Sequence, residues 1–70
     1  MTFDLKALRV AAIERNDTTA AAIARRTGIP YPTVIRWTSG KGVPAGPALA
    51  AIERAYGITA ARLFPAPQDA

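Results

Sequence analysis

The chain has 70 residues and a formal net charge of +4, from 9 lysine or arginine and 5 aspartate or glutamate residues. Half of the residues are hydrophobic, which predicts one small globular domain and excludes a disordered chain. The absence of cysteine and histidine excludes disulfides, Cys/His zinc sites, cysteine nucleophiles and histidine bases. We therefore expect no metal and no other cofactor.

The composition favours helices in a soluble protein. Alanine, the best helix former and a poor strand former, supplies 16 residues. No apolar run reaches the roughly 18 residues of a membrane span, and no basic-then-apolar leader begins the chain. We therefore expect an all-α protein that lies in the cytoplasm and has no membrane partner. If its positive charge binds a polyanion such as DNA, the protein is expected at the nucleoid.

Capping residues and helix breakers divide the chain into five short helices. The first is expected over Leu5–Arg15, with Asp4 as its N-cap and Phe3 spaced from Leu8 for a hydrophobic staple. The dipeptide Asn16-Asp17 ends this helix, so its aspartate is interpreted as a helix-end residue.

The second and third helices are separated by a glycine turn. The second is expected over 19–27, capped by one residue of the Thr18-Thr19 pair and ended by Gly28, which adopts the left-handed conformation at least cost. The third is expected over 32–39, because proline suits a first helical turn. Tyr31 is expected outside this helix, since a residue before proline is disfavoured in the helical region.

The fourth helix is expected over 47–57, with Ile58 folded back onto its end. Thr59 then caps a last single turn. The sequence therefore predicts one domain over 1–64, followed by a flexible C-terminal tail over 65–70.

Residues that could carry catalysis are few and scattered. The five carboxylates have no spacing that brings a pair to one site. The Gly40-Lys41-Gly42 loop lacks the spacing and the Ser or Thr that a Walker motif requires. We therefore expect that the protein is not an enzyme and has no small-molecule substrate.

The stretch 19–39 carries the most informative pattern. Ala24 is small where two helices cross, and Gly28 permits a sharp reversal of the chain. Val34 and Trp37, three residues apart, share one face of the third helix and are predicted to dock it inward. This spacing is typical of a helix-turn-helix unit.

A set of ordered motifs extends this pattern downstream. The helix-turn-helix set comprises Ile23, Ala24, Gly28, Ile29, Val34 and Trp37. The later set comprises Ser39-Gly40-Lys41, Pro44, Leu49, Ile52, Ala55, Gly57, Ile58, Thr59, Leu63 and Phe64. In these residues, over 18–64, the chain resembles the lambda-repressor-like (Cro/repressor type) helix-turn-helix DNA-binding family. The resemblance implies a compact five-helix domain. An excisionase-type winged helix would need strands, which the predicted helix after Pro47 disfavours.

Four features depart from the family's pattern, and the first is the poor alignment of the first helix. Ala20 stands where many members have a glutamine that contacts phosphate, and Thr38 stands where many have glutamate. The tripeptide at 30–32, Pro-Tyr-Pro, is an unusual start for a recognition helix.

The resemblance implies that the third helix enters the major groove of double-stranded DNA and reads a specific sequence. Its base-contacting positions are Tyr31, Pro32, Thr33, Ile35 and Arg36. Arg36 is the main candidate for specificity because a guanidinium matches the O6/N7 edge of guanine, whereas the apolar side chains suit thymine methyl groups. The phosphate-contacting positions are Thr18, Thr19, Ser39 and Lys41.

Each position has a structural alternative. Arg36 is alternatively a solvated helix residue, Ile35 part of a wider core stripe, and Tyr31 a residue packed beside the turn. The Arg25-Arg26 pair is interpreted as ordinary charge at the end of the second helix, where it complements the helix dipole. The Leu63-Phe64 pair belongs either to the core or to a dimer interface.

The expected role is control of transcription by a small phage or prophage Cro/repressor-like protein. Because 70 residues leave no room for a sensor domain, occlusion of a promoter is the simplest mechanism, and a homodimer on a palindromic site stays open. Two other roles are alternatives: a protein-interaction module such as an antitoxin-like partner, and a phage recombination or excision factor that shapes DNA. Steep weakening of binding by salt would favour DNA over an apolar protein partner.

Overall fold

The computed structural model describes residues 3–65, which form five helices and no strand. The helices are α1 (Leu5–Ile13), α2 (Ala20–Thr27), α3 (Tyr31–Thr38), α4 (Pro47–Tyr56) and α5 (Ala60–Leu63). The expected all-α fold with five helices is therefore confirmed. Most of the expected tail, residues 66–70, lies outside the described residues.

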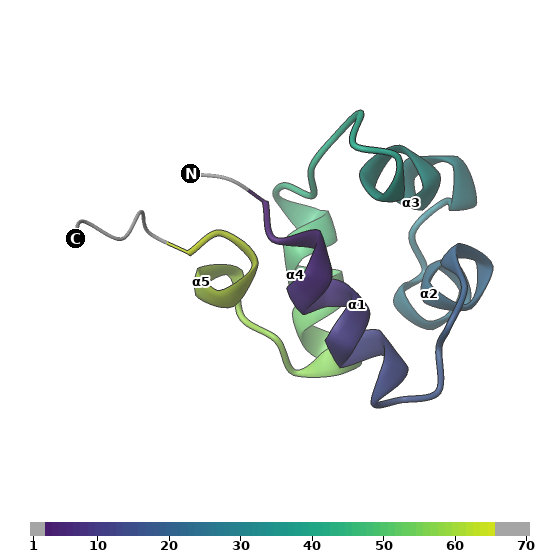
Figure 1. Cartoon of the computed structure of the whole chain (residues 1–70), viewed down its shortest axis with the longest axis horizontal. Helices are drawn as coiled ribbons and strands as arrows, with labels where there is room; N and C mark the ends of the chain where they lie inside the picture. The colour runs from purple at the N-terminus through teal and green to yellow at the C-terminus, as the bar shows by residue number, and fades with distance from the viewer. Residues whose placement is uncertain (1–2, 66–70) are drawn as a thin grey trace.

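Contacts between helices divide the domain into two sides. Helix α2 packs against α3 and α4, and α1 packs against α5. Figure 1 shows α2 and α3 together on one side and α5 on the opposite side. No helix within residues 3–65 is long and apolar enough to cross a membrane.

Helix α1 begins at the expected N-cap and ends before the expected residue. The carboxylate of Asp4 accepts a hydrogen bond from the Ala7 amide at 3.1 Å. The helix ends at Ile13 rather than at Arg15. The cause is the left-handed backbone of Asn16, whose φ is 65°, because asparagine tolerates this conformation better than most residues.

Helix α2 ends at the expected residue, Thr27, and begins one residue later than expected, at Ala20. The Thr19 hydroxyl oxygen accepts a hydrogen bond from the Ala22 amide at 3.1 Å, so Thr19 rather than Thr18 is the N-cap. Gly28 has a φ of 76° and donates its amide to the Ala24 carbonyl at 2.9 Å. The left-handed glycine reverses the chain toward α3.

Helix α3 begins at Tyr31, so the expectation that Tyr31 lies outside it is wrong. Pro32 occupies the second helical position, where an amide has no acceptor within the helix, and the proline loses no hydrogen bond there. The Pro30 carbonyl accepts hydrogen bonds from the amides of Thr33 at 3.0 Å and Val34 at 3.2 Å. These bonds outweigh the steric preference of a residue that precedes proline. The helix also ends one residue before the expected position 39.

The chain turns sharply between α4 and α5. Gly57 is left-handed, with a φ of 70°, and Ile58 is buried against the core, as predicted. Thr59 is the N-cap of α5, but its side chain makes no capping hydrogen bond, contrary to expectation. Its carbonyl instead accepts hydrogen bonds from the amides of Arg62 at 3.0 Å and Leu63 at 3.2 Å. The turn is therefore held by the backbone.

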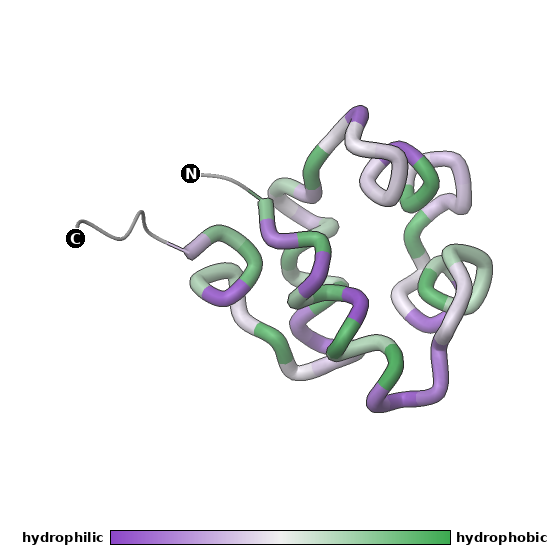
Figure 2. Tube along the Cα trace, in the orientation of Figure 1, coloured by the Kyte–Doolittle hydropathy of each residue, from purple (hydrophilic) through white to green (hydrophobic). Residues whose placement is uncertain are grey.

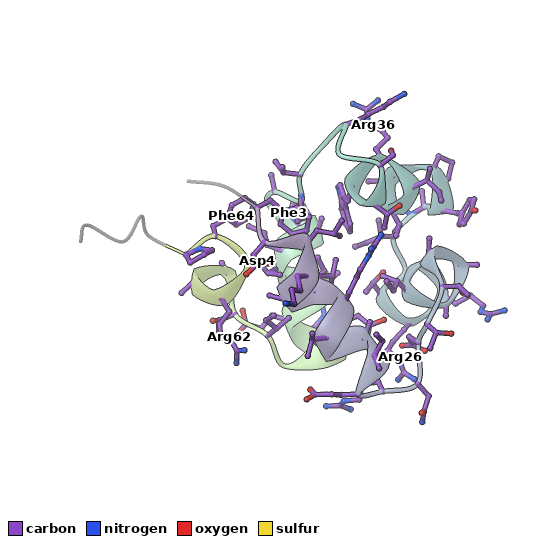
Figure 3. The ribbon with its side chains drawn as sticks, in the orientation of Figure 1. Phe3, Asp4, Arg26, Arg36, Arg62 and Phe64 are labelled. Carbon is purple, nitrogen blue, oxygen red and sulfur yellow. The ribbon has the colours of Figure 1, made fainter. Side chains whose placement is uncertain are left out.

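Every helix contributes buried residues to the core, and the two ends of the described chain are in contact with each other. Its buried members include Leu8, Ile23, Val34, Ile52 and Leu63. The Asp4 amide donates to the Leu63 carbonyl at 2.7 Å, and the Phe3 and Phe64 ring centroids lie 5.6 Å apart. Figure 3 shows these two rings beside each other near α5. Leu63 is therefore a core residue.

Candidate nucleic-acid interface

Helix α3 has one buried face and one exposed face. Val34 is fully buried and Trp37 is 3% exposed, which confirms that this pair docks the helix inward. Helix α2 is in contact with α3 along this side. Because the buried pair fixes the rotation of α3 about its axis, the outward side chains have a defined orientation.

The outer face of α3 is apolar at its N-terminal end. Tyr31 is 50% exposed and Ile35 is 36% exposed, and neither belongs to the buried core. Pro32 is also exposed, whereas Thr33 is half-buried. Residues four apart lie above one another on a helix surface, so the side chains at 31 and 35 are neighbours. We call Tyr31, Pro32 and Ile35 the α3 apolar surface.

Arg36 follows this surface and is exposed. Its Nη2 donates to the Lys41 carbonyl at 3.4 Å, and the Lys41 amide donates to the Arg36 carbonyl at 2.8 Å. A Cβ atom added to Gly42 would lie 3.5 Å from Arg36 Nε, so the guanidinium lies beside the loop backbone. Figure 3 places Arg36 at the outer edge of the molecule. The loop restrains the guanidinium while most of its five donors stay unpaired within residues 3–65.

The polar residues at the end of α3 use their hydroxyl groups internally. The Ser39 hydroxyl donates to the Ile35 carbonyl at 2.8 Å, and the Thr38 hydroxyl donates to the same carbonyl at 3.0 Å. Ser39 must give up this bond before its hydroxyl can donate to a phosphate. Lys41 is exposed in the following loop and keeps its ammonium group at the surface.

The N-terminus of α2 faces a groove shared by three helices. Thr18 and Thr19 are exposed and line this groove with Arg9 of α1 and Thr38 of α3. The amides of the first two residues of α2 have no acceptor within residues 3–65. Unpaired amides and the helix dipole favour an anion at this point, and the Arg9 guanidinium adds a full positive charge.

The structure brings the two groups of predicted phosphate-contacting residues toward one end of α3. Thr38 lines the groove at the α2 N-terminus, and Ser39 and Lys41 follow it in the chain. Sequence reasoning missed Arg9, because only the packing of α1 beside α2 brings it to this groove. The one local signal is that residue 9 follows the buried Leu8 and points to solvent.

Sequence reasoning also missed a buried carboxylate in the connection before α2. Asp17 is 9% exposed and forms an ion pair with Arg26, whose Nε donates to Oδ2. The Tyr56 hydroxyl of α4 donates to the same oxygen at 2.8 Å. Figure 2 shows this connection as a hydrophilic run at one edge of the molecule, and Figure 3 labels Arg26 beside it. The interpretation of Asp17 as a simple helix-end residue is wrong, since its carboxylate joins the connection to α2 and α4.

The charge states of this network support its hydrogen bonds. The Arg26 guanidinium holds the pKa of Asp17 below its ordinary value, and the Tyr56 hydroxyl acts in the same direction against the effect of burial. Burial raises the pKa of Tyr56, and the neighbouring carboxylate adds to that rise. At neutral pH, Asp17 is therefore the charged acceptor and Tyr56 the protonated donor. The network holds the segment that leads directly into the Thr18-Thr19 pair.

The site holds no set of residues suited to a metal ion. Within residues 3–65, no three His, Cys, Asp or Glu side chains are arranged to hold one. What the arrangement offers instead is an exposed helix face, a restrained guanidinium and a positively polarised groove. These features suit a polyanion.

Comparison with known proteins gives one family match. A family model described as helix-turn-helix matches residues 5–63, a span that contains all five helices. The span includes the outer face of α3, the start of α2 and the loop that contacts Arg36. No curated protein and no solved structure matches the chain.

Proposed function

The chain belongs to the lambda-repressor and Cro-like helix-turn-helix family of DNA-binding regulators, and from this premise we propose that it reads a specific sequence of double-stranded DNA with α3 in the major groove. The observation that carries this proposal is the division of α3. Val34 and Trp37 are buried and anchor the helix, whereas Ile35 and Arg36, which lie between them in the sequence, are exposed. The major groove admits a helix of this kind.

Arg36 is proposed as the main reader of a base edge. Its planar fork of donors matches the O6 and N7 atoms of guanine. The hydrogen bond to the Lys41 carbonyl, at 3.4 Å, restrains the side chain before binding and lowers the entropy lost on contact. Tyr31, Pro32 and Ile35 are proposed to meet apolar groups of neighbouring bases, and Thr33 to bond a base or a phosphate.

Phosphate groups are proposed to bind at two places near the C-terminal end of α3. At the start of α2, Thr18 and Thr19 line a groove that Arg9 also lines, and the first two amides of the helix have no acceptor among residues 3–65. In the loop after α3, Lys41 supplies an exposed ammonium group and Ser39 a hydroxyl. Such contacts fix the orientation of the protein on the duplex but carry no sequence information.

We further propose a biological role as a small repressor, of the phage or prophage type, that occludes a promoter. A homodimer would place two copies of α3 about one helical turn apart, roughly 34–36 Å, on a palindromic site. Phe64, half-buried beside Phe3, is the proposed edge of that interface.

Selection of bound duplexes from a random pool, at two salt concentrations, tests the proposal. The expected result is an enriched motif that contains guanine and an affinity that falls steeply as salt rises, because phosphate contacts release counterions. A palindromic motif would support the dimer, and a single half-site would overturn it. Failure to enrich any motif, with weak binding that is insensitive to salt, would overturn the proposed function and favour a protein-interaction module.

A further inference from the structure

The α3 apolar surface offers hydrocarbon on a helix face that is proposed to meet base edges. Tyr31 is 50% exposed and Ile35 is 36% exposed, and Pro32 lies beside them on the same end of the helix. Tyr31 and Ile35 are one helical turn apart, so their side chains form a continuous apolar strip. On a helix face that is proposed to meet base edges, such a strip can pack against apolar groups of the bases.

The hydrogen-bonding groups near this strip are few. The hydroxyls of Thr38 and Ser39 both donate to the Ile35 carbonyl, at 3.0 Å and 2.8 Å. The Arg36 guanidinium is therefore the strong donor beside the strip, and most of its N–H groups are unpaired within residues 3–65. Direct readout by this helix then combines one charged donor, Arg36, and the hydroxyls of Tyr31 and Thr33 with several carbon contacts.

The major groove presents one apolar group, which is the methyl group on C5 of thymine. Cytosine methylated at C5 carries the same group at the same position of a pyrimidine ring. A carbon surface that packs on one methyl group will pack on the other, because dispersion and desolvation do not depend on the rest of the base. The guanine that pairs with methylcytosine also offers O6 and N7 to a neighbouring guanidinium.

Resting on the proposed function, we propose that the α3 apolar surface reads C5-methyl groups of pyrimidines beside a guanine held by Arg36. The protein then accepts 5-methylcytosine in place of thymine, and methylation of cytosine in its site raises its affinity. Exposed Arg36 follows Ile35 in the helix and is bonded to the loop at Lys41, and the chain carries a net charge of +4. This charge favours DNA over an apolar protein surface as the occupant.

Removing or adding single methyl groups in the selected duplex tests this proposal. Each thymine is replaced in turn by deoxyuridine, which removes only the C5-methyl group. At a position that contacts the strip, the association constant should fall about fourfold, the effect of exposing one methyl group. At the same position, a C·G pair should bind weakly, and a 5-methylcytosine·G pair should recover about fourfold relative to it.

Protein variants connect this effect to the strip. Ile35→Ala should bring the ratio of thymine to deoxyuridine affinity close to one at its contact position, and Tyr31→Ala should do so at a neighbouring position. Thermal melting checks that both variants fold. Val10→Ala is the matched control, because Val10 is an exposed aliphatic residue, 48% accessible, that lines a different groove with Tyr56 and Gly57. It should keep the full methyl effect.

The outcomes separate this inference from the proposed function. A specific duplex whose affinity does not change with deoxyuridine or 5-methylcytosine would overturn methyl reading while leaving sequence-specific binding intact. A methyl effect that persists in both strip variants would also overturn the assignment. If no duplex is selected at all, the proposed function fails and the inference fails with it.

Discussion

The two faces of α3 differ in solvent exposure, although their residues are next to one another in the sequence. Val34 and Trp37 are buried, whereas Ile35 is 36% exposed and Arg36 is exposed. One short helix therefore carries a stability determinant and a recognition surface side by side. Neighbouring substitutions should therefore have separable effects: those on the buried face should change the free energy of unfolding, and those on the exposed face should change DNA affinity.

The largest expected effect is on the inner face. Trp37→Ala should lower the free energy of unfolding by about 3–5 kcal/mol, because it removes a large side chain from a packed core and leaves a cavity. Urea unfolding followed by circular dichroism measures this loss. A variant that unfolds like the wild-type protein would place Trp37 at the surface and remove the basis for the two faces.

A smaller loss of stability is expected from a residue outside α3. Tyr56→Phe removes the hydroxyl that donates to Asp17 at 2.8 Å and should cost about 1.5–3 kcal/mol of unfolding free energy, as for hydrogen bonds to charged groups. The base preference of the variant should match that of the wild-type protein, since the network lies behind the interface. An altered base preference would show that the network shapes the outer face directly.

The same network should make stability depend on acid. Because Arg26 lowers the pKa of Asp17 in the folded protein, the stabilisation is present above the ordinary aspartate value of about 3.9 and is lost as pH falls through the folded value. Unfolding experiments from pH 7 to about pH 2 measure this loss. Asp17→Asn should show a flatter dependence, and parallel curves for the two proteins would contradict the ion pair.

On the outer face, Arg36→Ala should weaken binding to the selected duplex by about 1–3 kcal/mol and relax the preference at one base position. Its free energy of unfolding should stay within about 0.5 kcal/mol of the wild-type value, as for most surface substitutions. Arg62→Ala, on α5 at the opposite side of the domain (Figure 3), is the matched control and should change neither quantity. A retained base preference in Arg36→Ala would contradict its reading role.

The smallest effect is expected in the loop after α3. Lys41→Ala should weaken binding similarly for all sequences and reduce the slope of log affinity against log salt by about 1. Lys6→Ala removes the same charge from α1, where Lys6 lines the groove beside Tyr56, and should leave the slope unchanged. Equal slopes for all three proteins would remove Lys41 from the proposed phosphate contacts.

The parts of the fold that could be predicted depend on local signals. Asp4, Thr19 and Gly28 act within one helical turn of their own positions, so their caps and turns follow from residue type. The spacing of Val34 and Trp37 likewise fixes the inner face of α3. Tyr31 was misplaced because two local preferences compete there, and the hydrogen bonds of the first turn prevail.

The network of Asp17 could not be predicted, because its partners are distant in sequence. Tyr56 is 39 residues away from Asp17 and meets it only after α4 has packed against α2. The burial of a tyrosine, which requires a partner for its hydroxyl, is the one signal available in advance. Arg9 at the α2 groove is a second feature of the site that only tertiary packing creates.

Titration of the isotope-labelled protein with its selected duplex, followed by amide chemical shifts, shows directly which helix contacts the DNA. If α3 enters the groove, the largest shifts fall on 31–36, on the start of α2 and on the loop at 39–42, while the exposed residues of α4 and α5 change little. Shifts concentrated on α4 and α5, with 31–36 unchanged, would contradict the assignment of α3 as the helix that enters the groove.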